Sequence, residues 1–471
     1  MQATAEPLST QDLGALLTEE HAREIYRRGQ EAVVFALLAQ AKQLAQLQPG
    51  KPGPSTPSGS IPPYQKPTMP KRRGKGPGRR PGHAGSCRSR PAKIDETKTH
   101  RLKSCPDCGG RLKRCNQTRT RFTEDIPENI NPVVTEHVIH RDWCPQCDKQ
   151  VEPKVSDAMP GSQIGNRVLV LTAWLHYGLG TTISQIVETF NYHLRMKVTP
   201  GGLVQMWHRL AELLYAWYEQ IQQEGLKSAV LHADETGWRV NGKTHWLWCF
   251  STQDLTYYMI DRSRGSPALM KFFTEAFAGT LVSDFWGAYN AVQCGSRQKC
   301  LVHLLRDLEY VEQYRTVDKH WSEFAKKLRR LIHDAMRLTQ YEPAERTSRR
   351  HRLNVRLQAL IDAQWKHREA RRLIKRLRRH CNDLFTFLDY DNVPYDNNHA
   401  ERAIRPAVII RKNSLSNRSN RGADTQAILM SVYRTLKQRG HHPLATIVKA
   451  LEICISTGQM PPLPANFTAD G

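Results

Sequence analysis

Two neighbouring acids interrupt a run of apolar and aromatic residues in the middle of the chain. The run SAVLHADETGWRV, from Ser228 to Val240, is typical of a buried strand, yet it carries Asp234 and Glu235 near its centre. Burying a carboxylate is costly unless a partner compensates its charge. A divalent cation is one such partner, since carboxylate oxygens are the ligands that Mg²⁺ and Mn²⁺ prefer. The pattern therefore suggests a metal site on a strand.

The residues that follow predict the fold that positions these acids. Asn241-Gly242 is a strong hairpin signal between SAVLHADETGWRV and the strand KTHWLWCFST, and LTYYMIDR is a third strand. Ser266-Pro267 is expected to open the helix ALMKFFTEAF, and a tight Gly279 to precede the strand TLVSDF. The short helix GAYNAV and the strand QKCLVHL complete the series. Three antiparallel strands, helix, strand, helix, strand is the order of the ribonuclease H-like fold.

That order has a geometric consequence for a second acid, Asp284. The first and fourth strands of such a sheet are parallel neighbours, so Asp234 and Asp284 are expected side by side. Two carboxylates that close repel each other, and a divalent cation allows both to stay ionised. A ligand set made of oxygen atoms favours Mg²⁺ or Mn²⁺ over zinc. Glu235 is not expected to join them, because successive residues of a regular strand point to opposite faces.

A third acid, Glu401, lies in the stretch YDNNHAERAIRPAVIIRKN. It comes early in a helix that Asn397 or Asn398 is expected to cap, and an acid near a helix N-terminus is electrostatically favoured. Arg405 lies four residues on, where it could steady the carboxylate or hold a phosphate. The alternative is an ordinary surface pair of Glu401 and Arg405. Together with two acids at strand ends in a basic chain, the metal-ligand interpretation is favoured.

Two CxxC pairs, CPDC and CPQC, indicate a second metal site. Four thiolates around one tetrahedral ion are the ligand set of structural zinc, and the alternative is four free thiols. The runs TRTRFTEDIP and VVTEHVIHRDW between the pairs predict strands, and Cys115 is the expected spare thiol. The predicted zinc ligands are Cys105, Cys108, Cys144 and Cys147.

The chain as a whole is strongly basic. Its 69 Lys and Arg residues against 45 Asp and Glu give a formal net charge of +24, which favours nucleic acid or an acidic membrane surface as partner. Residues 49–93 are rich in Pro, Gly and Ser and contain no acid, so this linker is expected to remain unfolded alone and to bind DNA phosphates. A merely solubilising linker is the alternative. The residues predicted to contact phosphates are Lys71, Arg72, Arg73, Arg79 and Arg80.

The sequence predicts a cytoplasmic location. No stretch is long and apolar enough for a transmembrane helix, so no membrane partner is expected. The start MQATAEPLSTQDLG lacks the features of a signal peptide. The 11 cysteines are therefore interpreted as reduced thiols, some of them on metal.

Three further segments are expected to be helical. Residues 18–48 predict one helix, whose apolar spacing suits a short coiled coil or packing on its own chain. Residues 166–218 predict several helices, the last opened by Thr199-Pro200, compatible with a helix-turn-helix or with a plain three-helix packing module. Residues 319–381 predict a basic helical insertion that either grips DNA or forms a solvated hairpin.

Together these motifs resemble those of a known family. The stretches HADETGWRV, VSDFWGAYN followed by QKCLVHLLRDL, NNHAERAIRPAVIIRKNSL, and CPDC…CPQC behind a basic GRRPGHAG linker are similar to transposases of the insertion sequence 66 family, a branch of the DDE transposases. The order of the modules also matches, so the resemblance covers nearly the whole chain. It implies a metal-dependent enzyme that cleaves DNA at the ends of its element and joins them to target DNA.

The resemblance also implies roles for individual residues. Asp234 and Asp284 match the two catalytic aspartates of the family and Glu401 its glutamate, which together bind two divalent cations. The four cysteines of the CxxC pairs match its zinc-binding module. The implied partners are the terminal repeats of the element, target DNA, further copies of this chain and, for some members, small accessory proteins of the same element.

Two other functions stay open from the sequence. A non-catalytic DNA-binding protein from a decayed or domesticated element would keep the zinc module and lose an acid, whereas all three acids are present here. A ribonuclease H-like nuclease would cut DNA without joining it. The recognition modules ahead of the catalytic domain favour the transposase.

The predicted architecture is a multidomain α+β protein whose ribonuclease H-like α/β catalytic domain carries a helical insertion. Smaller modules and a linker precede that domain. The expected boundaries are 1–48 for the N-terminal helix, 49–93 for the linker, 94–160 for the zinc-ribbon-like module, 161–226 for the helical DNA-binding segment, 227–318 with 382–457 for the catalytic domain, 319–381 for the insertion and 458–471 for the tail.

Overall fold

A computed structural model describes residues 19–27, 29–30, 32–34, 36–38, 90–113, 119–127 and 130–467. The five basic residues predicted to contact phosphates in the linker, and Cys115, lie outside these ranges. The described chain divides into two compact units. The first contains the described residues from 19 to 38, Val282–Ala291 and Arg297–Asn397, and the second contains the described residues from 90 to 281, Val292–Ser296 and residues 398–467.

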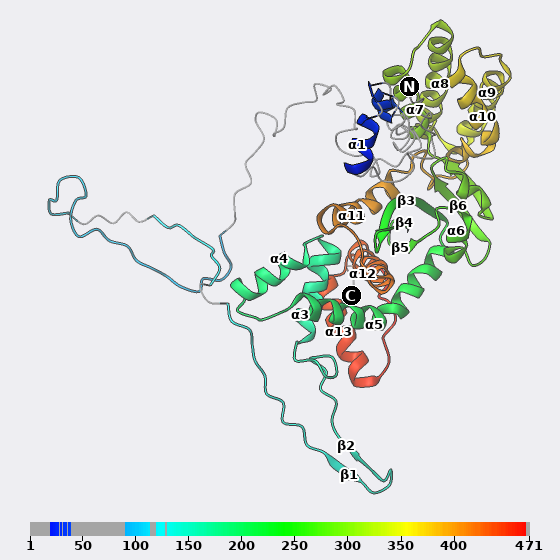
Figure 1. Cartoon of the computed structure of the whole chain (residues 1–471). Helices are drawn as coiled ribbons and strands as arrows, with labels where there is room; N and C mark the ends of the chain where they lie inside the picture. Colours follow the sequence, from blue (N-terminus) through cyan, green and yellow to red (C-terminus); the bar gives the residue numbers. More distant parts are fainter. Residues whose placement is uncertain are drawn as a thin grey trace, which may run out of the picture. The chain divides into compact units, whose positions relative to one another are not determined.

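The helices and strands of both units carry the labels of Figure 1. None of the described helices is long and apolar enough to cross a membrane. The elements are α1 (Glu19–Arg27), β1 (Asp142–Cys144), β2 (Lys149–Val151), α3 (Asn166–Ala173), η3 (Trp174–Gly178), α4 (Ile183–Glu188), η4 (Thr189–His193), α5 (Pro200–Leu226), β3 (Val230–Val240), β4 (Lys243–Ser251), β5 (Thr256–Asp261), α6 (Ser266–Phe272), β6 (Phe277–Ser283), η5 (Gly287–Ala291), β7 (Cys294–Lys299), α7 (Leu301–Tyr314), α8 (Lys319–Arg337), η6 (Leu338–Gln340), α9 (Pro343–Asp362), α10 (Arg368–Arg379), η7 (Cys381–Asp383), η8 (Thr386–Leu388), α11 (Asn398–Ser414), α12 (Asn420–Gln438) and α13 (Pro443–Thr457).

A glycine interrupts the N-terminal helical segment. α1 ends at Arg27, and Gly29 has a φ of +100°, outside the right-handed helical region. Helical residues resume at 30, 32–34 and 36–38. The prediction of one continuous helix over 18–48 is therefore wrong at Gly29, because glycine reaches this conformation without the steric penalty of other residues. The coiled coil stays a prediction.

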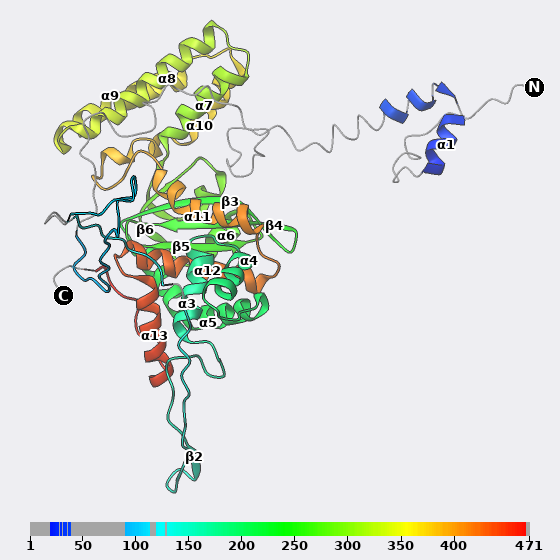
Figure 2. The ribbon, with the colours of Figure 1, turned by 90° about the vertical axis from the view of Figure 1, so that its left-hand side faces the viewer.

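The residues around the cysteine pairs contain less strand than the sequence predicts. β1 and β2 pair antiparallel with Cys144 opposite Lys149, and extended chain lies on both sides of this hairpin (Figure 2). Residues 119–127 and 130–141 contain no strand. The prediction for TRTRFTEDIP is thus wrong over 119–127, and that for VVTEHVIHRDW holds only from Asp142. β-Branched and aromatic residues favour strands when a neighbouring strand covers them, and within the described chain none does so here.

Two helix starts follow the expected capping chemistry. The Thr182 hydroxyl accepts a hydrogen bond from the Gln185 N–H, and the Gln185 side chain accepts one from the Thr182 N–H, which opens α4 with a capping box. The Thr199 hydroxyl accepts from the Gly202 N–H at 3.1 Å, which confirms the predicted start of α5. α5 packs against α3, α12 and β5. Its apolar stripe is therefore core, which favours the packing-module interpretation of this segment over a recognition helix.

Five strands form the central sheet in the order β5-β4-β3-β6-β7. β3 and β4 are antiparallel with Val240 opposite Lys243, and β4 and β5 are antiparallel with Cys249 opposite Tyr258. The turn between β3 and β4 is the predicted Asn241-Gly242 pair, in which both residues have positive φ, as a two-residue hairpin of type I′ requires. The first three strands are therefore confirmed.

β6 and β7 run parallel to each other. The Phe277 N–H donates to the Gln293 carbonyl at the start of both strands, and the Cys300 N–H donates to the Ser283 carbonyl after their ends. Bonds that join like ends of two strands identify a parallel pair. Since Cys300 is the N-cap of α7, the predicted strand QKCLVHL is wrong beyond Lys299.

Gly279 lies inside β6 rather than in a turn before it. A Cβ atom at this position would stand 2.4 Å from the carbonyl oxygen of Ser228, so close approach of the backbones requires glycine here. The start of α6 also differs from the prediction. Gly265 is its N-cap and Ser266 its first residue, with no side chain capping the helix.

Helices close the open edge of the sheet at β5 (Figure 1). The N–H groups of Thr256 and Tyr258 donate to hydroxyls of α12, at 3.1 Å to Thr435 and 2.8 Å to Ser431. From α5, the Tyr218 hydroxyl donates to the Tyr258 carbonyl at 2.7 Å. An uncovered edge strand would expose such groups to pairing with other chains, and these side chains satisfy them instead.

The first compact unit is largely helical. α8 packs against α7, α9 and α10, and Figure 2 shows α8 and α9 lying side by side. The predicted helical character of residues 319–381 is confirmed by α8, α9 and α10. The compact unit is wider than that insertion, because it extends over Arg297–Asn397 and includes α7.

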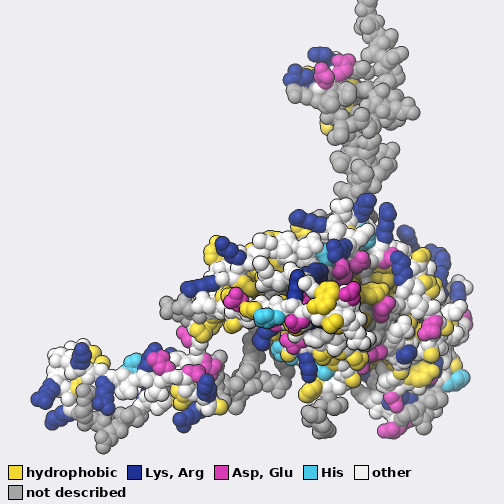
Figure 3. All heavy atoms as spheres, turned by 90° about the horizontal axis from the view of Figure 1, so that it is seen from below, with side chains coloured by type: hydrophobic (Ala, Val, Ile, Leu, Met, Phe, Trp, Pro, Cys, Tyr) yellow, Lys and Arg dark blue, Asp and Glu magenta, His cyan; other side chains and the backbone are white. Residues whose placement is uncertain are grey.

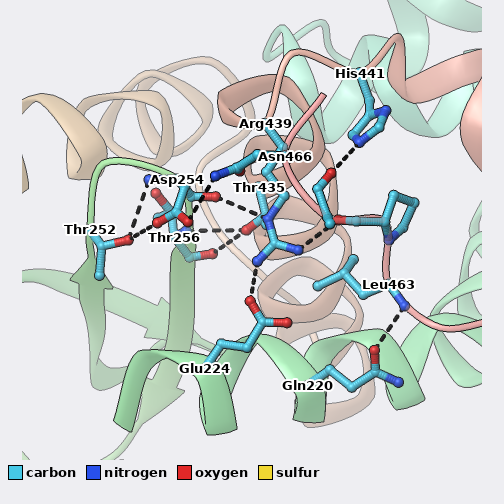
Figure 4. Close-up of polar contacts among 12 residues, drawn as sticks. Gln220, Glu224, Thr252, Asp254, Thr256, Thr435, Arg439, His441, Leu463 and Asn466 are labelled. Atoms are coloured by element: carbon cyan, nitrogen blue, oxygen red, sulfur yellow. Dashed lines mark hydrogen bonds and ion pairs between the residues drawn. The ribbon is translucent and has the colours of Figure 1, made fainter. Parts of the chain in front are cut away.

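Arg439 joins the C-terminal segment to the rest of the second unit (Figure 4). Its Nε donates to the Asp254 carbonyl at 3.3 Å, its Nη1 to the Pro464 carbonyl at 2.7 Å, and its Nη2 to the Glu224 carboxylate. The Arg439 side chain is only 3% exposed. One buried guanidinium therefore links α5, the turn before β5 and the C-terminal segment.

Replacing Arg439 with Met is expected to lower the free energy of unfolding by about 2–4 kcal/mol, because several hydrogen bonds of a charged group are lost together. The measurements are urea denaturation and limited proteolysis of the C-terminal segment. Lys437→Met, two residues earlier on an exposed position of α12, is the matched control. Equal stability of the two variants would contradict this role of Arg439.

Candidate active site and cysteine module

Asp234 lies on the face of the sheet that α11 covers. It is opposite Cys249, which is opposite Tyr258, and directly opposed residues of antiparallel strands project to the same face. The Tyr258 hydroxyl donates to the carbonyl of Ala403 in α11. Burial raises the pKa of the Cys249 thiol well above its ordinary value, and the nearby charge of Asp234 raises it further.

Glu235 lies on the opposite face and has a cationic partner. Its carboxylate accepts hydrogen bonds from Nε and Nη2 of Arg264 at 3.1 and 2.9 Å. The Arg264 guanidinium carbon also lies 4.3 Å from the ring centre of Trp246. The side chain of Glu235 is 2% exposed and that of Arg264 is 19% exposed. The acid next to Asp234 is thus compensated by a structural ion pair, which agrees with its predicted exclusion from the metal site.

Glu401 lies in the first turn of α11, which begins at Asn398. α11 packs against β3 and β4. His399, two residues before Glu401, and His232, two residues before Asp234, have ring centroids 4.9 Å apart. This contact brings the first turn of α11 to the part of β3 that carries Asp234. The position at the helix N-terminus stabilises a negative charge.

The other end of α11 is anchored to the same strand. Arg411 donates to the Thr236 hydroxyl at 3.0 Å and to the Gly237 carbonyl. Arg405, by contrast, is exposed one turn after Glu401. The anchored end fixes the helix on the sheet, and a role of Arg405 in holding phosphate stays a prediction.

A cationic residue near this face was missed by sequence reasoning. Burial raises the pKa of Cys249 and Tyr258 and lowers that of His399, and the positive charge of Arg434 in α12 lowers all three. The Nε of Arg434 is buried, and no hydrogen-bond acceptor reaches it from the described residues. No motif marks the stretch YRTLKQRG around it, so only the packing of α12 on the sheet identifies Arg434 as a neighbour of the site.

Asp284 belongs to the other compact unit, directly after β6. Its Oδ1 accepts the Trp286 N–H at 2.8 Å. Lys299 at the end of β7 donates through Nζ to the Ser283 hydroxyl at 3.0 Å and to the Asp284 carbonyl at 2.9 Å. Lys299 is fully buried. A buried ammonium group thus holds the backbone that carries this carboxylate.

Each cysteine pair forms a tight turn. The Cys105 N–H donates to the Gly110 carbonyl at 3.0 Å, and the Gly109 N–H donates to the Cys105 carbonyl at 2.9 Å. Hydrogen bonds from the backbone of the second cysteine in each pair lower the pKa of Cys105 and of Cys144. Such donors favour the thiolate, which is the form that binds zinc.

The donor types of both regions fit the predicted metals. Oxygen atoms of Asp234, Asp284 and Glu401 suit Mg²⁺ or Mn²⁺, and the thiolate-favouring turns suit zinc. Over the described part of the chain, however, no group of three or more His, Cys, Asp or Glu side chains is gathered to hold an ion. The two cysteine pairs therefore stand as separate turns, and the metal sites stay predictions.

Comparison with known proteins identifies the class. A model for the transposase IS66 family matches residues 161–425, more than half of the chain, including Asp234, Asp284 and Glu401. A model for the zinc-finger binding domain of transposase IS66 matches residues 103–148, which contain both cysteine pairs. No curated protein matches the chain.

The matches define this protein as a transposase. The chain belongs to the IS66 family, which confirms the resemblance seen in the sequence.

Proposed function

We propose that this transposase catalyses metal-dependent cleavage at the ends of its element and transfer of the cleaved strands into target DNA. The observation that carries the proposal is the packing of the first turn of α11, with Glu401, against the part of β3 that carries Asp234. Both acids lie within the residues that match the transposase IS66 family. The ion pair of Glu235 with Arg264 gives Glu235 a structural role, which supports Asp234 as the catalytic acid of this strand.

The strand order supports a ribonuclease H-like arrangement of the catalytic domain. Three antiparallel strands β3, β4 and β5, then α6, β6, η5 and β7 give the sheet order β5-β4-β3-β6-β7. β6 is a neighbour of β3, and Asp284 is the first residue after β6. We therefore assign Asp234, Asp284 and Glu401 as the catalytic acids.

These three carboxylates would hold two Mg²⁺ or Mn²⁺ ions, whose positive charge activates water and stabilises the leaving oxygen of a phosphodiester. The chain itself supplies the positioning. Asp234 is fixed by its strand, Glu401 by α11, and Asp284 by the buried Lys299 at its backbone carbonyl. Rigid elements of this kind keep ligands in place during a reaction.

The reaction has two phosphoryl transfers. Hydrolysis of a phosphodiester at the end of the element leaves a 3′-hydroxyl on the element and a 5′-phosphate on the flanking DNA. That 3′-hydroxyl then attacks a phosphodiester of the target, forms a new P–O bond and releases a 3′-hydroxyl of the target strand. Neither transfer passes through a covalent protein–DNA intermediate, so no Ser or Tyr nucleophile is assigned.

Basic surfaces of the chain are suited to hold the DNA. Figure 3 shows one face on which Lys and Arg side chains (dark blue) are common and Asp and Glu side chains (magenta) are interspersed. In the insertion, exposed basic residues gather on α10 and the turn before it. The exposed basic residues of this part of the insertion are Lys366, Arg368, Arg371, Lys375, Arg378 and Arg379. We propose that these residues, the linker and Arg405 bind DNA phosphates.

Joining two ends of an element requires that both be held together, so we propose that the active form is a homo-oligomer. Accessory proteins of the same element are a further proposed partner. Sedimentation of the protein with and without DNA carrying the element ends measures the oligomeric state. Addition of host lysate to the strand-transfer reaction measures whether accessory proteins are required.

The test of the function is a strand-transfer assay with purified full-length protein, Mg²⁺ or Mn²⁺, and DNA carrying the ends of the element. Metal-dependent joined products establish the transposase. Cleavage without joining supports the nuclease alternative. Tight binding with neither reaction supports a non-catalytic DNA-binding protein, unless added lysate restores joining.

The cysteine module is proposed to hold one zinc ion through Cys105, Cys108, Cys144 and Cys147. Replacing any of the four with Ser is expected to remove zinc, measured by atomic absorption of the purified protein, since structural zinc sites use four ligands. Cys381→Ser is the matched control and is expected to retain zinc.

Acidification offers an independent measurement. Zinc binds thiolates, so protons compete with it for the cysteines, and zinc is expected to leave as the pH falls. The hydrogen bonds that lower the pKa of Cys105 and Cys144 favour their thiolates and are expected to move this release to lower pH. Full zinc content in the Cys105→Ser protein would contradict the assignment.

A further inference from the structure

The residue after Asp284 lies against the helical insertion. The guanidinium carbon of Arg376, in α10, lies 5.1 Å from the ring centre of Phe285. His380, which follows α10, meets the same ring edge-on with centroids 5.6 Å apart. A cation within about 6 Å of an aromatic ring centre is attracted to its face. Two side chains from the end of the insertion thus hold the neighbour of a catalytic acid.

Arg376 is itself held from the other side. It forms an ion pair with Asp307 of α7, whose side chain is only 3% exposed. Arg372, one turn earlier on α10, lies 3.9 Å from the same carboxylate. Burial raises the pKa of Asp307, and the charges of Arg376 and Arg372 oppose that rise. Asp307 therefore fixes the guanidinium of Arg376 in its position over Phe285.

The contacts of Asp284 come from both sides of its backbone. Lys299 at the end of β7 binds its carbonyl at 2.9 Å, and Arg376 covers the next side chain. The carboxylate also accepts the Trp286 N–H at 2.8 Å, so its orientation depends on the path of residues 284–286. That path is set by β7 and by α10 together.

We propose that α10 of the helical insertion positions Asp284 for metal binding through the contact of Arg376 with Phe285. This inference rests on the proposed function, and it gives the insertion a task besides contact with DNA. We assign Arg376 as a positioning residue, because its contact is with Phe285, the neighbour of Asp284 in the chain. Groups that orient a metal ligand from behind typically change metal affinity by about 10–100-fold when they are removed.

The test measures Mn²⁺ binding to the full-length protein by electron paramagnetic resonance, with the Asp284→Asn protein defining the site. Phe285→Leu removes the ring and leaves the ion pair of Arg376 with Asp307 intact. It is expected to weaken Mn²⁺ binding about tenfold while the thermal unfolding midpoint stays near that of the wild type. Arg376→Lys keeps a positive charge beside Asp307 but loses the planar guanidinium group. This variant is also expected to bind Mn²⁺ more weakly than the wild type.

Arg372→Lys is the matched control, since Arg372 neighbours Asp307 without covering Phe285, and wild-type Mn²⁺ affinity is expected. If Arg376→Lys fails to fold, the Mn²⁺ affinity of Phe285→Leu alone tests the inference. Wild-type Mn²⁺ affinity in Phe285→Leu overturns the inference and leaves the proposed function standing. A wild-type protein without an Asp284-dependent Mn²⁺ site contradicts the proposed function and the inference together.

Discussion

Replacing Asp234, Asp284 or Glu401 with its amide is expected to reduce cleavage and strand transfer by about a hundredfold or more. The amide keeps the size of the side chain and loses the negative charge that a divalent cation requires. Binding of DNA by the basic surfaces is expected to stay within about twofold, because these contacts are made with phosphates elsewhere. The measurements are the strand-transfer assay and a DNA-binding titration at one fixed salt concentration.

Glu275→Gln is the matched control for these variants. Glu275 is exposed between α6 and β6, so the same chemical change is made away from the proposed site. Wild-type activity is expected for this variant. Retained cleavage by Asp284→Asn would remove that residue from the catalytic set, and equal losses in all four variants would point to a general effect of charge.

The second large effect is expected on stability, from Arg264→Met. This change leaves the carboxylate of Glu235, whose side chain is 2% exposed, without its cation. Breaking a buried pair by removing one partner typically costs about 3–5 kcal/mol. The free energy of unfolding is measured by urea denaturation followed by tryptophan fluorescence. Arg262→Met, at an exposed position two residues earlier, is expected to change it by less than about 0.5 kcal/mol.

The double replacement Glu235→Met with Arg264→Met separates pairing from packing. Apolar residues of similar volume often replace a buried ion pair with little loss, so the double variant is expected to recover most of the stability. Recovery of strand transfer in the same protein would show that Glu235 supports the strand and takes no part in the chemistry. An inactive but stable double variant would instead return Glu235 to the candidate catalytic acids.

Features encoded within a few residues were predicted well from the sequence. The turn at Asn241-Gly242 requires only a positive φ at two positions. The start of α5 at Thr199-Pro200 requires only the capping hydroxyl of threonine and the φ that the proline ring fixes. The order of strands followed from such local signals. The placement of Asp284 after a strand and of Glu401 early in a helix followed in the same way.

Boundaries that depend on neighbours in space were predicted less well. The apolar residues of QKCLVHL are compatible with a strand or with a helix. In the structure β7 ends at Lys299, and α7 begins after the N-cap residue Cys300. Gly279 resembles a turn residue, whereas the close carbonyl of Ser228 is what requires glycine. The local preference of a residue for strand or helix does not predict which other segment of backbone will pack next to it.

Contacts between side chains that are far apart in the sequence could not be predicted from it. Arg264 lies 29 positions from Glu235, and Arg376 lies 69 positions from Asp307. Arg434 reaches the Asp234 face from α12, outside the residues that match the family model. Each of these cations sits in a stretch rich in Arg and Lys, so composition alone does not distinguish it from its solvated neighbours.

The cover of β5 by α12 limits how the catalytic part of this chain can be produced as a fragment. The family match ends at residue 425, six positions into α12. A recombinant piece cut there would lack Ser431 and Thr435, whose hydroxyls accept the N–H groups of Tyr258 and Thr256. The unit that folds cooperatively is therefore longer than the unit that is recognisable by sequence, and a fragment intended for crystallisation should continue through the C-terminal segment held by Arg439.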